Sequence, residues 1–139
     1  MFTSDTEHKK AQDRLILIDL LIALFCVLFS AVYESFSHGV WSYCMVYAFA
    51  FPLALGVLPL SIIRMTGAPY PNRFVRNAIR AGIASLTIGS FVTGALEIYG
   101  TTHPLTAVYW IAGGALVLIG AAVYAATLLK RTARKNRTA

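Results

Sequence analysis

Four long apolar runs occupy most of the sequence and limit the structures that the chain can adopt. They cover residues 15–33, 43–63, 81–96 and 105–129, and the only charged residue inside them is Asp19. A helix needs about 20 apolar residues to cross the roughly 30 Å of bilayer hydrocarbon. The third run reaches that length when its flanks at 78–79 and 98–99 are included. Because lipid offers no partners to backbone N–H and C=O groups, we expect each run to be a spanning helix.

The runs predict an all-α integral membrane protein with a single domain over residues 1–139. Charged residues make up only 13% of the chain, whereas a soluble domain carries about 25%. The connections between the runs are short, so we expect an up-down-up-down four-helix bundle. The expected helices cover about 14–38, 43–64, 73–99 and 104–130, with residues 1–13 and 131–139 as cytoplasmic tails.

The basic residues predict the orientation of the chain. All twelve Lys and Arg lie before the first run, between the second and third, or after the fourth, and none lies in 34–42 or 97–104. By the positive-inside rule, the basic segments face the cytoplasm. We therefore expect a multi-pass protein of the plasma (inner) membrane with both ends of this chain in the cytoplasm.

The net charge of +6 indicates anionic lipid headgroups as partners, and no nucleic acid, because the cations flank the apolar runs. Four of these cations are expected to contact headgroups: Arg73, Arg76, Lys130 and Arg131. Small residues indicate close helix packing, since Ala81, Ser85, Gly89 and Thr93 recur every four residues. Such faces also fit a second copy of the chain or another membrane protein.

Residues at the expected helix ends support these limits. Ser42 is placed to cap the second helix, and Gly100 is placed to end the third. Pro104 suits the first turn of the fourth helix, with Thr102 or His103 as its cap. Pro52 predicts a kink in the second helix.

The two halves of the sequence resemble each other weakly. Residues 29–34 read FSAVYE and residues 92–97 read VTGALE, and each segment precedes a short connection that contains one His. A duplication would relate two parallel-repeat helical hairpins by an axis along the membrane normal. The alternative is chance similarity, because simple apolar segments resemble one another.

Two Glu-His pairs form the first candidate site. Glu34 with His38, and Glu97 with His103, lie at the two connections that contain no cation. Two carboxylates and two imidazoles suit a divalent metal such as Zn, Mn or Fe. Alternatively, the two imidazoles are axial ligands of a haem. The competing interpretation is that these side chains are solvated or cap helix ends.

Aromatic side chains at the same level form a second candidate site, a pocket for a quinone, a flavin or another flat ligand. These residues are Tyr33, Trp41, Tyr43, Tyr99, Tyr109 and Trp110. The competing interpretation is an interfacial belt that anchors the protein in the bilayer.

Asp19 is a third candidate, because a carboxylate inside a membrane is costly and is usually paired. Arg80 begins the apolar part of the third helix at a similar depth and is the expected ion-pair partner. The functional alternative is a proton or cation relay from Asp19 to the carboxylates at the opposite end.

Three functions remain open from the sequence. The first is a ligand-, metal- or haem-binding module of a membrane redox or metal-handling system. The second is a small transporter or channel subunit that uses Asp19 and the Glu-His pairs. The third is an accessory subunit of a larger membrane complex. Enzymatic chemistry is not expected, since no nucleotide-binding or HExxH motif occurs and Cys26 and Cys44 are isolated.

Overall fold

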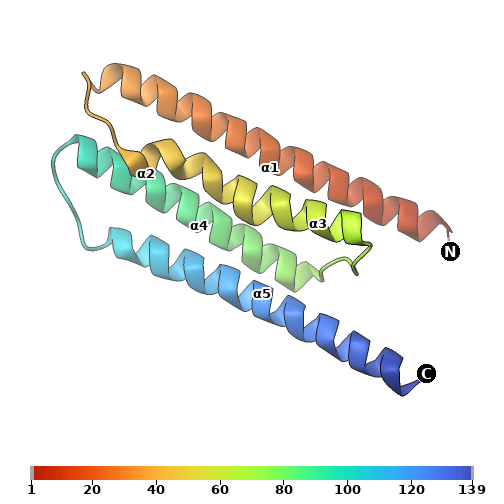
Figure 1. Cartoon of the computed structure of the whole chain (residues 1–139). Helices are drawn as coiled ribbons and strands as arrows, with labels where there is room; N and C mark the ends of the chain where they lie inside the picture. The colour runs from red at the N-terminus through yellow and green to blue at the C-terminus, as the bar shows by residue number, and fades with distance from the viewer. Residues whose placement is uncertain (1, 139) are drawn as a thin grey trace.

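The computed structural model describes residues 2–138, which fold into helices without a strand in that range (Figure 1). The elements are α1 (Phe2–Phe36), α2 (Tyr43–Val46), the 3-10 helix η1 (Tyr47–Phe49), the π-helix η2 (Pro52–Val57), α3 (Leu58–Thr66), α4 (Arg73–Ile98) and α5 (Thr106–Arg137). The segments from α2 to α3 continue one another as a single broken rod. The described residues therefore form four long helices, each long and apolar enough to cross a membrane, as predicted.

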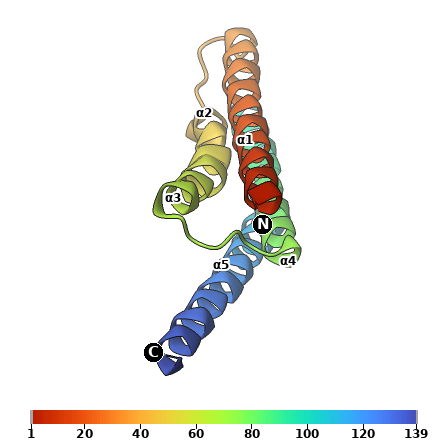
Figure 2. The same ribbon diagram turned by 90° about the vertical axis from the view of Figure 1, so that its right-hand side faces the viewer.

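The four rods lie side by side, and both ends of the chain lie at one end of the assembly (Figure 1). We call this the termini end, and it also carries the connection between α3 and α4. The opposite end carries the connections from α1 to α2 and from α4 to α5, and we call it the hairpin end. In Figure 2 the last turns of α5 project away from the other helices.

The first and last helices extend beyond their predicted limits. α1 begins at Phe2 instead of residue 14, and α5 continues to Arg137 instead of ending near residue 130. The added segments contain no proline or glycine and several good helix formers, such as Lys, Gln and Arg. At its other end α1 stops at Phe36, two residues before the predicted His38. His38 itself adopts φ 54°, a left-handed conformation that ends the helix.

The second rod changes helix type near Pro52, where a kink was predicted. Pro52 has no N–H to donate to the carbonyl of Ala48, so a regular α-helix cannot continue through it. The chain adopts a 3-10 turn before this position and a π-helix from Pro52 to Val57. A π turn encloses one residue more than an α turn, and this rare geometry often occurs at functional sites.

Glycines bring α4 and α5 into close contact. A Cβ atom on Gly113 would lie 2.7 Å from Leu86 Cγ and 3.0 Å from the carbonyl oxygen of Gly82. Within the predicted small-residue stripe, Gly89 is buried, whereas Ala81 is exposed. The tightest contacts therefore use the glycines of α4 and α5 and only part of that stripe. Large apolar side chains cover much of the outer surface, as expected of helices that face lipid.

Candidate functional site

The structure pairs Glu97 with the beginning of the second rod. Glu97 Oε2 accepts a hydrogen bond from Ser42 Oγ at 2.6 Å, and its Oε1 lies 3.6 Å from Cys44 Sγ. Ser42 Oγ also accepts from the backbone N–H of Met45 at 3.4 Å, so this residue caps α2 as predicted. The Glu97 carboxylate thus links α4 to the start of α2.

The two histidines of the hairpin end bind their own backbone. His38 Nδ1 lies 2.8 Å from the carbonyl oxygen of Phe36. His103 Nδ1 accepts the N–H of Leu105 at 3.2 Å. This contact is not the predicted helix cap, because α5 begins at Thr106 with Leu105 at the N-cap position and no side-chain cap bond. Within residues 2–138, no three side chains among His, Cys, Asp and Glu lie close enough to hold a metal ion. The arrangement does not assemble the four-residue site, and the metal or haem stays a prediction.

Glu34, the remaining member of that set, differs from Glu97. Its Oε1 atom is buried and has no hydrogen-bond partner among the described residues. The structure therefore gives the two predicted carboxylates unequal surroundings.

The six predicted aromatic residues do not share one pocket. Tyr33 and Tyr99 line a groove of about 420 Å³ between α1 and α4. Trp110 packs edge-on against Phe51, with ring centroids 5.7 Å apart, and Tyr109 covers Gly89. The other two are exposed: Trp41 and Tyr43. This distribution suits anchors better than a single site for a flat ligand.

Buried hydroxyls link the rods near the hairpin end, and the sequence analysis missed them. Ser30 Oγ donates to the carbonyl of Met45 at 2.7 Å, and Ser90 Oγ donates to the carbonyl of Cys44. Both acceptors belong to the short α2 segment. A signal was present in α1, because Gln12, Asp19, Cys26 and Ser30 are spaced by seven, seven and four residues, which places them on one face.

The structure brings Asp19 and Arg80 together. Arg80 Nη2 lies 3.4 Å from Asp19 Oδ1, and the exposed fractions of the side chains are 36% for Arg80 and 5% for Asp19. Gly56 of the π-helix packs on the carboxylate, since a Cβ atom there would lie 2.8 Å from Asp19 Oδ2. The sequence analysis named the ion pair but not the glycine that makes room for it.

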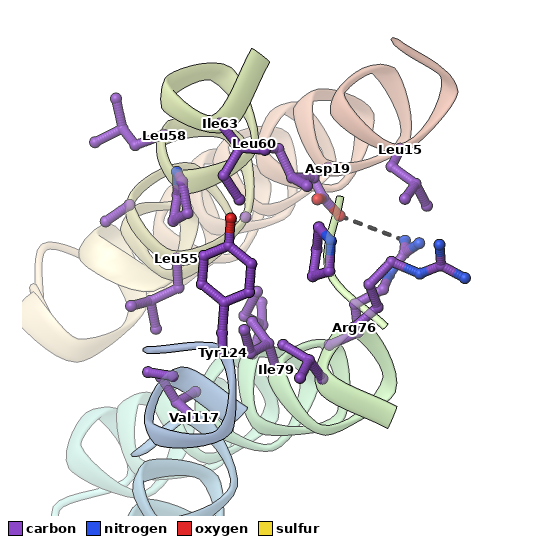
Figure 3. A pocket seen from close by; sticks show the side chains of 18 of the residues that line it. Leu15, Asp19, Leu55, Leu58, Leu60, Ile63, Arg76, Ile79, Val117 and Tyr124 are labelled. Atoms are coloured by element: carbon purple, nitrogen blue, oxygen red, sulfur yellow. Dashed lines mark hydrogen bonds and ion pairs between the residues drawn. The ribbon is translucent and has the colours of Figure 1, made fainter. Parts of the chain in front are cut away.

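This ion pair borders a cavity of about 540 Å³ between α1, η2, α3, α4 and α5 (Figure 3). Its walls are mainly apolar, and Asp19, Arg76 and Arg80 are the charged residues that line it. Tyr124 also lines it, and its hydroxyl donates to the carbonyl of Pro69 at 3.0 Å. The hydrophobic periodicity of the sequence could not reveal this cavity, because the cavity depends on the distances between separate helices.

Aromatic and ionic contacts fix the termini end beside the cavity. The Arg76 guanidinium lies 4.8 Å from the centroid of the Tyr70 ring. The ring of His8 lies 5.8 Å from that of Tyr70 on a tilted plane. Asp13 and Arg64 form an ion pair between α1 and α3. The extra turns of α1, which were predicted to be a tail, thus contact both α3 and the connection that follows it.

The remaining predicted lipid contacts lie at the same end. Arg73, Lys130 and Arg131 are exposed, whereas Arg76 is half-buried. The first three are free to reach headgroups, and Arg76 lines the cavity.

Comparisons with models of known protein families, with curated proteins and with solved structures give no match to this chain.

Proposed function

We propose that this protein is a membrane-embedded binding protein for an amphiphilic molecule whose apolar part occupies the cavity beside Asp19 and Arg80. The cavity of about 540 Å³ carries this proposal. Ligand sites usually measure about 300–1,000 Å³ and combine apolar walls with a few convergent polar groups. This cavity has both properties, so it replaces the hairpin end as the favoured site of ligand binding.

The ligand would enter sideways from the bilayer. Leu58 and Ile62 line the cavity, and their exposed fractions are 56% and 57%. The apolar wall of the cavity therefore continues into a surface of the kind that faces lipid. An amphiphile dissolved in the membrane could reach the cavity without crossing water.

The orientation in the membrane is part of the proposal. We infer an up-down-up-down bundle in the plasma membrane with the termini end in the cytoplasm, because the twelve cations lie at that end. The test uses two single-cysteine variants, Thr102→Cys and Thr138→Cys, in a chain without Cys26 and Cys44. A membrane-impermeant maleimide should label only Thr102→Cys in intact cells, and the opposite pattern would reverse the topology.

Cavity filling tests the binding function. Ala121 and Ala122 are neighbours on α5 and both are exposed, but only Ala121 lines the cavity. A photoactivatable dodecanol with a diazirine in its chain should label wild-type residues of α3, α4 and α5 around the cavity. Ala121→Phe should reduce this labelling roughly tenfold, which corresponds to a loss of about 1.4 kcal/mol in binding.

Ala122→Phe is the matched control, because it adds the same side chain one position away from the cavity. It should leave labelling at the wild-type level. Equal labelling of all three proteins, or labelling spread over every lipid-facing surface, would reject the proposal.

A second candidate function is a proton or cation relay, favoured by the buried polar residues between Asp19 and Glu97. Ser30 and Ser90 lie between these carboxylates, and both hydroxyls are buried. The test is a pH-gradient-driven proton flux in liposomes. A relay requires that Asp19→Asn abolishes the flux, whereas no flux in the wild-type protein would remove this candidate.

A further inference from the structure

The charges that line the cavity do not cancel. Asp19 carries one negative charge, and Arg76 and Arg80 carry two positive charges between them. The nearby Asp13 is already paired with Arg64. An arginine remains charged in a protein, so the lining keeps an excess of one positive charge. Uncompensated charge beside an apolar cavity is unfavourable, and a bound anion would remove that cost.

Arg80 has spare hydrogen-bonding capacity. A guanidinium carries five N–H donors. Among the described residues, its one hydrogen bond or ion pair is the contact of Nη2 with Asp19 Oδ1, at the long distance of 3.4 Å. The remaining donors are available to a ligand, because 36% of the side chain is exposed. Asp19 therefore holds the Arg80 guanidinium in place and leaves most of its N–H donors unused.

Arg76 is held in position by the connection between α3 and α4. Its guanidinium lies over the Tyr70 ring at 4.8 Å from the centroid, and a cation–π contact does not use the N–H donors of a guanidinium as hydrogen bonds would. The same connection is fixed by the hydrogen bond from Tyr124 to Pro69. The Tyr70 hydroxyl is buried and has no hydrogen-bond partner among residues 2–138.

We infer that the ligand is an anionic amphiphile, with a carboxylate or phosphate headgroup that binds Arg76 and Arg80 and an alkyl chain in the cavity. The inference rests on the proposed binding function and specifies its ligand class. Arginine matches the planar geometry of carboxylate and phosphate oxygens with paired hydrogen bonds. A cationic amphiphile would add a third positive group to the two arginines and is excluded on that ground.

Photolabels that share one diazirine-bearing chain test the headgroup. We compare dodecanoate, dodecyl phosphate, dodecanol and dodecylammonium with the full-length protein in neutral-lipid nanodiscs. At least one anion should label the cavity residues roughly tenfold more than the alcohol, a difference of about 1.4 kcal/mol. The ammonium should label them less than the alcohol does. The two anionic probes distinguish a carboxylate from a phosphate.

Two arginine variants test whether Arg76 gives the preference for the anion over the alcohol. Arg76→Met should abolish the preference for the anion while labelling by the alcohol persists, which also shows that the variant is folded. Arg73→Met is the matched control, because Arg73 is exposed and does not line the cavity. It should keep the full preference.

The outcomes separate the two proposals. Equal labelling by anions and alcohol, or a preference for the ammonium, overturns the anionic headgroup and leaves the binding function intact. No cavity labelling by any of the four probes overturns both. An anion preference that survives Arg76→Met, or is lost equally in Arg73→Met, also overturns the assignment to Arg76.

Discussion

The hairpin end and the termini end of the bundle bury polar side chains with opposite results. At the hairpin end, Ser30, Ser42 and Ser90 donate hydrogen bonds to backbone or carboxylate oxygens of a neighbouring rod. At the termini end, Asp19 and Arg80 stand at the edge of a cavity of about 540 Å³. Buried polar side chains thus hold the rods together at the hairpin end, whereas at the termini end they line a cavity.

Glycine and helix type explain this difference. Gly94 lets α4 approach Met45 so closely that a Cβ atom would lie 2.8 Å from Met45 Cβ. Beside the cavity, the second rod is instead a π-helix from Pro52 to Val57, whose turns enclose one residue more than α turns. Gly56 within it accommodates the Asp19 carboxylate rather than another backbone. Glycines therefore let helices approach each other at Gly94 and make room for a carboxylate at Gly56.

The largest expected effect tests the close packing of the hairpin end. Gly94→Leu should lower the free energy of unfolding by about 3 kcal/mol, because Met45 Cβ and backbone N lie where the side chain must go. Gly114→Leu is the control, since nothing lies within 4 Å of a Cβ atom there. Denaturant titration in bicelles provides the measurement. Equal stability of the two variants would show that the hairpin end is not closely packed.

The next effect tests the ion pair of the termini end. Arg80→Met should destabilise the protein by about 2 kcal/mol, because it leaves the buried Asp19 carboxylate without its partner. The double variant Asp19→Leu/Arg80→Met should recover most of this loss in the same titration, since it removes both charges. A double variant that is less stable than Arg80→Met would show that Asp19 is held by groups other than Arg80.

A smaller effect measures the hydroxyl contacts between the rods. Ser30→Ala should cost about 1 kcal/mol, because the Met45 carbonyl loses its donor. Ser35→Ala serves as the comparison, since Ser35 is exposed and binds only the Val32 carbonyl of its own helix. Thermal unfolding in detergent should separate the two. No difference between them would mean that Ser30 does not hold the rods together.

The smallest effect distinguishes a local backbone contact from a metal ligand at His103. His103→Ala should cost about 0.5 kcal/mol by removing the acceptor of the Leu105 N–H. His103→Asn should restore that stability, because an asparagine side-chain oxygen can also accept a backbone N–H two residues on. Metal analysis of the purified proteins is the second measurement. Stoichiometric metal in the wild type that is lost in His103→Asn would establish His103 as a ligand.

The helical fold was largely predictable, because apolar runs of this length favour long helices. Four apolar runs had to be helices, and the described residues contain four such helices. The pairing of Asp19 with Arg80 was named from depth alone, and the two side chains do meet. The extra turns at the two ends lie outside the apolar runs, so the hydropathy pattern did not predict them, although their helix-forming residues were a signal.

The candidate site was harder to predict, because it depends on three-dimensional spacing. Glu34 and Glu97 occupy similar positions before the two connections of the hairpin end. However, Glu34 has a buried oxygen without a partner among the described residues, whereas Glu97 accepts a hydrogen bond from Ser42. No sequence pattern reports the π-helix, whose Gly56 packs on the Asp19 carboxylate. The cavity beside Arg76 appears only once all four rods are in place.

The length of α1 has a mechanical consequence. Its 35 residues span about 52 Å at 1.5 Å per residue, which exceeds the roughly 30 Å of bilayer hydrocarbon. The helix contains neither glycine nor proline, so no residue within it favours a sharp kink. Because His8, Asp13 and Asp19 lie on this one unbroken helix, a tilt of its first turns would also move the wall of the cavity that Asp19 lines.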